Sequence, residues 1–172
     1  MNTVEAMVEI AVPVRTVYNQ WTQFKSFPRF MTVVKRVDQV RPTITRWVIG
    51  FGPVRREFEA EILEQQPDSH LIWRSLGRGP SHQGGVWFRP TMSGTTTVTV
   101  RIRIAARGRA RLVPRPAGVT SRVLGRELRH FKEFIEGLGQ EGGAWRGEIR
   151  DGRVLQAEPD PPRCRVPTWP VG

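Results

Sequence analysis

The segment from Val119 to Leu138 is the feature of this sequence that most constrains the fold. Apolar residues recur in it at steps of three and four, which is the spacing of one face of an α-helix. These residues are Val119, Val123, Leu124, Leu128, Phe131, Ile135 and Leu138. Arginine and lysine side chains fall mostly on the opposite side, and Gly137 with Gly139 ends the helix. A long helix with one apolar face needs a complementary surface to cover that face.

Strand-like segments before the helix supply that surface. Alternating apolar and polar residues predict strands over 3–11, 33–40, 43–49, 54–64, 71–76, 82–89 and 95–105. The short turns between them favour antiparallel neighbours. Because each strand has one polar face, the sheet has one solvated side and one covered side. The expected fold class is therefore α+β, with about seven strands packed against the long helix.

Two shorter segments interrupt this pattern after the first strand. Pro13 is well suited to the first turn of a helix, and Val14, Val17, Tyr18 and Trp21 give that helix an apolar side. The residues that follow, 24–31, are too irregular for a strand and too aromatic for a solvated loop. We expect them to fold back over apolar space.

The composition changes after Gly139. Glycine and then proline become frequent, so we divide the chain into a domain over 1–138 and an extension over 139–172. A small hairpin could form around Asp151-Gly152. From Gln156 onward we expect disorder or an extended arm.

Several classes of protein are disfavoured by the sequence. No apolar run approaches the roughly 20 residues of a membrane span, and the alternating N-terminus with Glu5 and Glu9 does not resemble a signal peptide. The only cysteine, Cys164, excludes an internal disulfide or a cysteine-based metal site. We find no nucleophile elbow, phosphate-binding loop or metal-ligand spacing. We expect a cytoplasmic protein without a cofactor or metal.

The positive charge is concentrated in one part of the chain. Residues 69–126 contain eleven arginines and no Asp or Glu, and the remaining basic and acidic residues are equal in number, so this part carries the whole net charge of +11. One interpretation is a surface for an anionic membrane, formed by Arg101, Arg103, Arg107, Arg109 and Arg111. The alternative interpretation is that these arginines occupy solvent-facing strand positions only because the composition favours arginine, and that they bind nothing. Nucleic-acid binding ranks last, because the arginines are not interleaved with aromatic residues.

The order of these elements, together with certain local phrases, resembles the polyketide cyclase/dehydrase branch of the START-like, or helix-grip, superfamily. The resemblance covers residues 3–138. Its phrases are Val12-Pro13, Val17-Tyr18-Asn19-Gln20-Trp21, Phe27-Pro28, Arg46-Trp47-Val48, Ile72-Trp73-Arg74-Ser75, Gly85-Val86-Trp87-Phe88, Gly94-Thr95-Thr96 and the helical run from Leu128 to Glu136. It implies a curved antiparallel sheet around the long helix, with an apolar cavity between them that binds lipids, quinones, hormones or polyketides.

The alternation of each strand indicates which side chains would face such a cavity. The inward set is Trp47, Phe58, Ile62, Trp73, Val86 and Phe88 from the sheet and Leu128 and Phe131 from the helix, with Phe27, Phe30 and Met31 at the mouth. Large aromatic rings on a concave sheet often shape an apolar pocket. The alternative is that these side chains only pack against one another as core, which is the better interpretation for the aliphatic ones.

Binding is the leading functional hypothesis, and catalysis is the alternative. The related aromatic polyketide cyclases place arginines and a tyrosine inside the cavity, whereas Ile62 and Trp73 occupy the corresponding inward positions here. Arg56 shares the face of Phe58 and is the one arginine expected inside, so it is a weak catalytic candidate. The sequence therefore predicts a carrier or sensor of an apolar small molecule, with a polyketide cyclase or dehydratase as the second hypothesis.

Overall fold

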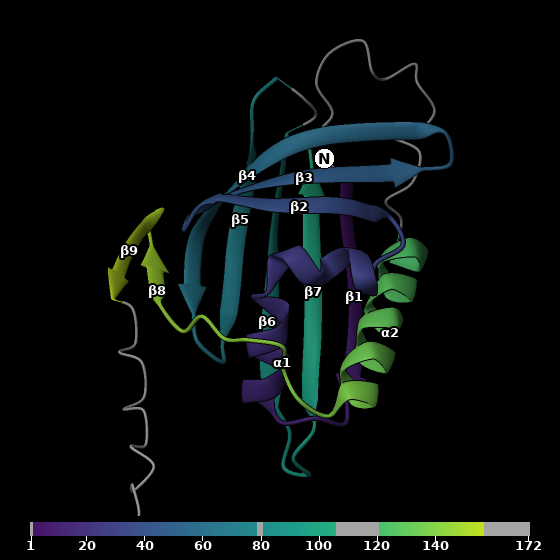
Figure 1. The fold of residues 1–172 in the computed structure, drawn as a ribbon, viewed down its shortest axis with the longest axis vertical. Coiled ribbons are helices and arrows are strands. Elements are labelled where there is room, and N and C mark those ends of the chain that lie inside the picture. The colour runs from purple at the N-terminus through teal and green to yellow at the C-terminus, as the bar shows by residue number, and fades with distance from the viewer. Residues whose placement is uncertain (1, 79–80, 106–120, 157–172) are drawn as a thin grey trace, which may run out of the picture.

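The computed structural model describes residues 2–78, 81–105 and 121–156. Its elements follow one another as β1 (Asn2–Ile10), α1 (Val14–Trp21), the 3-10 helix η1 (Phe24–Arg29), β2 (Val34–Arg41), β3 (Ile44–Phe51), β4 (Val54–Gln66), β5 (His70–Leu76), β6 (His82–Pro90), β7 (Thr96–Ile104), α2 (Ser121–Leu138), β8 (Glu148–Arg150) and β9 (Arg153–Gln156). The fold is the predicted α+β helix grip (Figure 1). Neither of its α-helices is long and apolar enough, over the described residues, to span a membrane.

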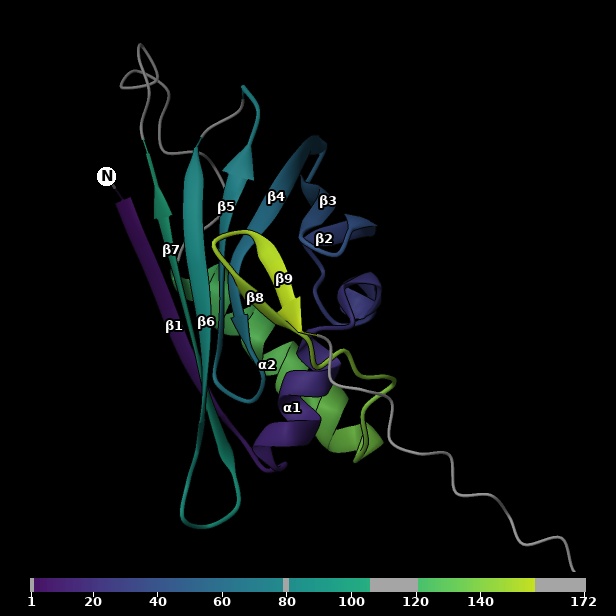
Figure 2. The ribbon, with the colours of Figure 1, turned by 90° about the vertical axis from the view of Figure 1, so that its left-hand side faces the viewer.

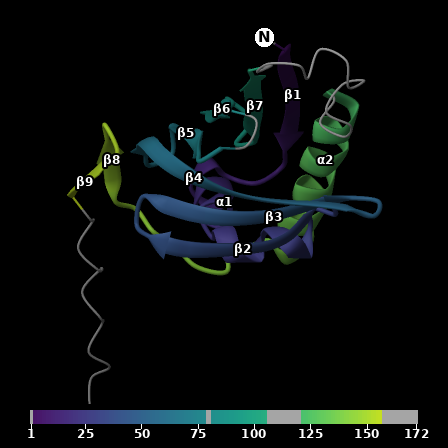
Figure 3. The ribbon, with the colours of Figure 1, turned by 90° about the horizontal axis from the view of Figure 1, so that it is seen from above.

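The sheet has nine strands, and its main path runs β1-β7-β6-β5-β4-β3-β2. All pairings along this path are antiparallel, as the short turns predict. Seen from above, the strands follow an arc, and α2 lies at its open side next to β1 (Figure 3). The inner face of the curved sheet and α2 together line a cavity.

The predicted apolar stripe attaches α2 to the sheet. Leu128, Phe131 and Ile135 are fully buried. Gly125 faces β1, where an added Cβ would lie 4.0 Å from the Cβ of Ala6, an ordinary van der Waals contact, so the helix and the strand meet here without a clash. The helix ends at Leu138, and Gly139 follows with φ +67° and donates its N–H to the carbonyl of Ile135.

The residues after α2 pack against the body of the fold. The strand β8 pairs with β4 through Gln65 and Ile149, beyond the part of β4 that β3 covers, and the hairpin β8–β9 turns at Asp151-Gly152. This hairpin lies on the side of the sheet away from α2 (Figures 1 and 2). Ile149 is buried, and Trp145 packs against the core. The extended arm expected from Gln156 onward falls almost wholly outside the described residues.

Arg146 fixes this segment. Its Nη1 donates to Oδ1 of Asp68 at 2.9 Å and to Oδ1 of Asn19 at 2.8 Å, while Nη2 donates to Oδ2 of Asp68 at 2.7 Å. The guanidinium also lies 5.6 Å from the ring centroid of Tyr18. A two-pronged contact of this kind restrains both partners, so the chain after α2 is held against α1 and the β4–β5 turn.

Candidate functional site

A cavity of about 240 Å³ lies between the sheet and the first turns of α2. Its wall is almost entirely apolar and comes from α1, η1, strands β3 to β7 and α2. Phe51, Ile104 and Val123 are half-exposed lining residues at the end of β3, the end of β7 and the start of α2. The cavity therefore approaches solvent at this end of the fold.

Part of the predicted site lines this cavity. The lining includes Phe27, Met31, Trp47, Phe58, Ile62 and Trp73. Phe27 and Met31 are buried, so they form part of the wall rather than the mouth that the sequence suggested for them. Whether these side chains touch a ligand stays a prediction.

The other predicted residues pack in the core and do not line the cavity. They are Phe30, Val86, Phe88, Leu128 and Phe131. The ring centroid of Phe131 lies 5.1 Å from that of Trp21 and 5.0 Å from that of Phe30, and Phe88 packs edge-on against Tyr18 at 5.4 Å. These rings fill the space beside the later turns of α2, which restricts the cavity to the first turns.

Arg56 lies on the predicted face but is exposed rather than inside the cavity. It pairs with Ile49, which does line the cavity. Arg56 is exposed because it lies near the turn of the β3–β4 hairpin. This hairpin extends beyond the rest of the sheet, so no neighbouring element covers the side chain (Figure 1). Alternation determines the face of a residue but not whether neighbouring elements cover it.

Trp47 contributes an aromatic ring whose polar atom is already satisfied. Its Nε1 donates to Oγ1 of Thr45 at 2.8 Å. The ring stacks on Phe58 with an interplanar angle of 4° and meets Phe27 edge-on. The neighbouring Arg46 points to the outer face and pairs with Glu59 at 2.8 Å, as the alternation predicts. The cavity therefore receives an apolar ring and no charge from this strand.

Trp73 is seated on Gly84 of the neighbouring strand. A Cβ built on Gly84 would lie 2.2 Å from Cζ2 of Trp73, so only glycine leaves room for the ring in this position. On the opposite face Gly85 seats the ring of Trp87 in the same way, with a closest distance of 2.4 Å. Two adjacent glycines thus hold one tryptophan inside the cavity and one outside it.

Three polar residues of the cavity wall, Thr45, His82 and Glu127, lie outside the predicted set. The ring of His82 lies 4.7 Å from that of Phe58, edge to face. Glu127 is 2% exposed and also lines the cavity. Glu127 could have been found, because it follows Leu124 by three positions and precedes Phe131 by four, which places it on the apolar stripe. Its charge, and not its position on the helix, kept it out of the predicted apolar set.

Tyr18, the only tyrosine, lies outside the cavity lining. Burial raises the pKa of its phenol to about 12, although Gln65 and the Arg146 guanidinium act in the opposite direction. The phenol therefore stays protonated near neutral pH. Tyr18 is a core residue, not an acid or base available to the cavity.

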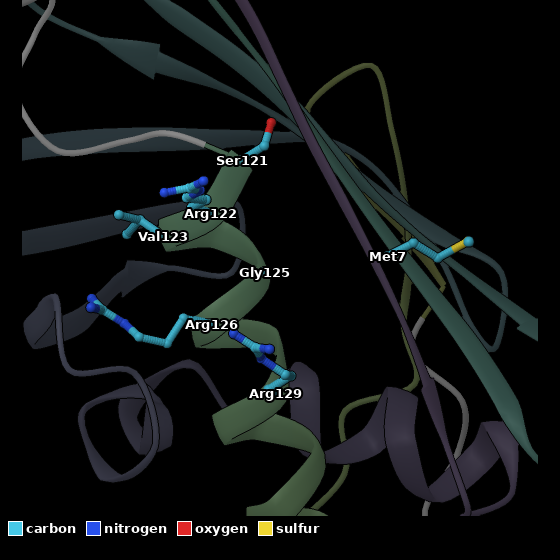
Figure 4. A pocket seen from close by; sticks show the side chains of 7 residues that line it. All are labelled: Met7, Ser121, Arg122, Val123, Gly125, Arg126 and Arg129. Carbon is cyan, nitrogen blue, oxygen red and sulfur yellow. The ribbon is translucent and has the colours of Figure 1, made fainter.

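A second hollow lies on the outer side of α2, between that helix and β1. This arginine groove, as we call it, has a volume of about 570 Å³ and is lined by Met7, Ser121, Arg122, Val123, Gly125, Arg126 and Arg129 (Figure 4). Nε of Arg126 lies 3.3 Å from Oε1 of Glu127. Within the described ranges, neither Arg122 nor Arg129 has a carboxylate at ion-pair distance. Val123 lines both the groove and the cavity, so a single turn of α2 separates them.

Known proteins resemble this chain over most of its length. Residues 10–136 match the model of a family described as polyketide cyclase/dehydrase and lipid transport. The chain is 40% identical over 149 residues to an uncharacterised 17.2 kDa protein of Streptomyces lincolnensis, and the match covers 87% of this chain and 99% of that relative.

Solved structures show the same architecture. A protein of Deinococcus radiodurans matches with a TM-score of 0.63 and 26% identity, over 81% of this chain and 99% of the other. The Zhui aromatase/cyclase of Streptomyces sp. R1128 matches with a TM-score of 0.67 and 13% identity, over 83% of this chain and 99% of the other. The second likeness concerns the fold alone.

Proposed function

The chain belongs to the polyketide cyclase/dehydrase and lipid transport family, as its sequence pattern predicts, and from this premise we propose that it is a carrier or sensor that binds an apolar small molecule in its cavity. The observation that supports the proposal is the lining, which is aromatic and aliphatic except for a few polar residues. Burial of apolar surface is the main source of affinity that such a lining offers a ligand.

The size of the cavity limits the ligand. An apolar cavity of roughly 150 Å³ accommodates benzene. The cavity of about 240 Å³ therefore favours a ligand of about two fused rings, such as a quinone headgroup or a short folded polyketide. A long lipid chain would have to extend through the end lined by Phe51, Ile104 and Val123.

Native mass spectrometry of the purified protein, followed by extraction, tests this proposal. We expect a retained apolar molecule, or an increase in melting temperature with bicyclic aromatic compounds. An empty protein whose melting temperature is unchanged by lipids, quinones and polyketide mimics would contradict it.

A second candidate function is that of a polyketide cyclase or dehydratase, which the buried carboxylate of Glu127 favours. A carboxylate in an apolar cavity can remove a proton from the carbon between two ketones of a poly-ketone substrate. Incubation with a poly-ketone mimic should then give a cyclised product with the wild type and not with Glu127→Gln. Arg56→Ala is the control, because an exposed arginine should not affect turnover. Absence of product from the wild type would remove this candidate.

We also propose that the protein approaches anionic membranes through its arginine-rich side. Arg101 and Arg103 are exposed, but Nε of Arg101 is paired with Glu5 at 2.5 Å. Arg107, Arg109 and Arg111 lie outside the described residues. The arginine groove adds positive charge that Glu5 does not neutralise, and such a surface attracts anionic lipid.

Sedimentation with vesicles tests the membrane proposal and its location. We expect binding to vesicles containing phosphatidylserine, no binding to phosphatidylcholine alone, and release by salt. Arg122→Glu/Arg129→Glu and Arg101→Glu/Arg103→Glu change the charge equally, so the variant that loses more binding identifies the surface. Equal binding to both kinds of vesicle would contradict the proposal.

A further inference from the structure

Glu127 is the buried charged group of the cavity wall, and its two oxygens have different surroundings. Oε1 accepts from Oγ1 of Thr32 at 2.8 Å and from Nε of Arg126 at 3.3 Å, and Nδ1 of His130 lies 3.8 Å away. Oε2 has one contact among the described residues, the backbone N–H of Val33, at an N–O distance of 3.5 Å. Hydrogen bonds to a carboxylate normally measure about 2.7–2.9 Å. Oε2 is therefore poorly satisfied.

A poorly satisfied carboxylate oxygen is costly in an apolar environment. A carboxylate oxygen can accept two hydrogen bonds, and a buried acceptor without a donor loses the solvation it had in water. Glu127 is 2% exposed, so bulk water has little access to it. Val33, the contact of Oε2, lines the cavity together with Glu127, whereas Thr32 and Arg126, the contacts of Oε1, do not. A donor that arrives with the ligand would therefore meet an acceptor that no protein group competes for strongly.

We infer that the molecule bound in the cavity carries a hydroxyl group, which donates a hydrogen bond to Oε2 of Glu127. This inference rests on the proposed binding function and specifies its ligand as an apolar, roughly bicyclic molecule with one hydroxyl, such as a naphthol. Arg126 already lies beside the carboxylate as a counter-charge. A neutral hydroxyl therefore fits better than an ammonium group, which would place a second cation near Arg126.

A pair of ligands that differ in one donor tests the inference. By isothermal titration calorimetry, the wild type should bind 2-naphthol at least about tenfold more tightly than 2-methoxynaphthalene, a difference of about 1.4 kcal/mol. In Glu127→Gln this preference should fall below about threefold, while the affinity for 2-methoxynaphthalene stays the same. In His82→Phe the preference should persist, because that variant keeps the carboxylate.

The outcomes separate the inference from the proposed function. Equal binding of both ligands by the wild type would overturn the inference and leave the cavity proposal standing. A preference that survives in Glu127→Gln, or disappears in His82→Phe instead, would also overturn it. Binding of neither ligand would overturn the inferred bicyclic ligand, and the proposed function would be contradicted only if lipids, quinones and polyketide mimics also failed to bind. If Glu127→Gln does not fold, Thr32→Val provides a second test: removing the donor of Oε1 leaves the carboxylate in place, so the tenfold preference must remain.

Discussion

Replacing Gly84 by alanine should push the ring of Trp73 into the cavity. The added Cβ would lie 2.2 Å from Cζ2, 2.6 Å from Cε2 and 2.8 Å from Cη2 of that ring. Carbon atoms pack at about 3.5–4.0 Å, so the ring has to move by more than 1 Å. Because Trp73 lines a cavity of only about 240 Å³, this shift removes space that a bicyclic ligand needs.

The cost in stability should be moderate and the cost in binding large. Overpacking of this kind destabilises a protein by about 1–3 kcal/mol, which corresponds to a fall of roughly 2–12 °C in melting temperature for a chain of this size. We expect Gly84→Ala to remain folded and to lose at least about tenfold in affinity for a ligand that binds the wild type, or about 1.4 kcal/mol. Circular dichroism and calorimetric titration measure the two effects.

Gly85→Ala is the matched control. The new Cβ would lie 2.4 Å from Cη2 of Trp87, a similar clash in the adjacent position. Trp87 is 37% exposed on the outer face, so its ring can move into solvent without entering the cavity. Ligand affinity should be unchanged. If Gly84→Ala keeps its affinity, or if Gly85→Ala loses as much, the ligand does not occupy the space beside Trp73.

Three further predictions concern the packing around the cavity. Phe131→Ala should lower the free energy of unfolding by about 3–5 kcal/mol in urea denaturation, and a loss below about 1 kcal/mol would mean that the ring is not packed as the structure shows. Arg146→Met should cost about 1.5–3 kcal/mol and expose the segment after α2 to limited proteolysis, since its bonds to Asp68 and Asn19 are lost; unchanged protease resistance would contradict the role of Arg146 as a clamp. The pKa of Tyr18 is raised from 10.0 to about 12 on folding, so its contribution to stability is complete below pH 10 and is lost as the pH rises towards 12. The free energy of unfolding, measured by urea denaturation, should therefore fall by about 2–3 kcal/mol over this range in the wild type beyond any fall in Tyr18→Phe, and parallel curves would refute the burial argument.

The sequence by itself determined the elements and the faces of the sheet. The period of two placed Trp47 on the inner face and Arg46 on the outer face, and the same rule separated Trp73 from Arg74. The period of three and four gave the stripe of α2. These regularities are local, because each follows from the backbone geometry of one strand or one helix.

Only the tertiary structure decided where along those faces the cavity lies. Phe88 and Phe131 have the predicted orientation, but rings from α1 and the ring of Phe30, which follows η1, fill the space beside them, while Trp47 and Trp73 stay next to empty space. Arg56 is exposed because its hairpin extends past its neighbours, and Glu127 is buried because Thr32 and Val33 cover it. Depth and cover depend on residues distant in sequence. A repeating pattern within one element therefore carries no information about them.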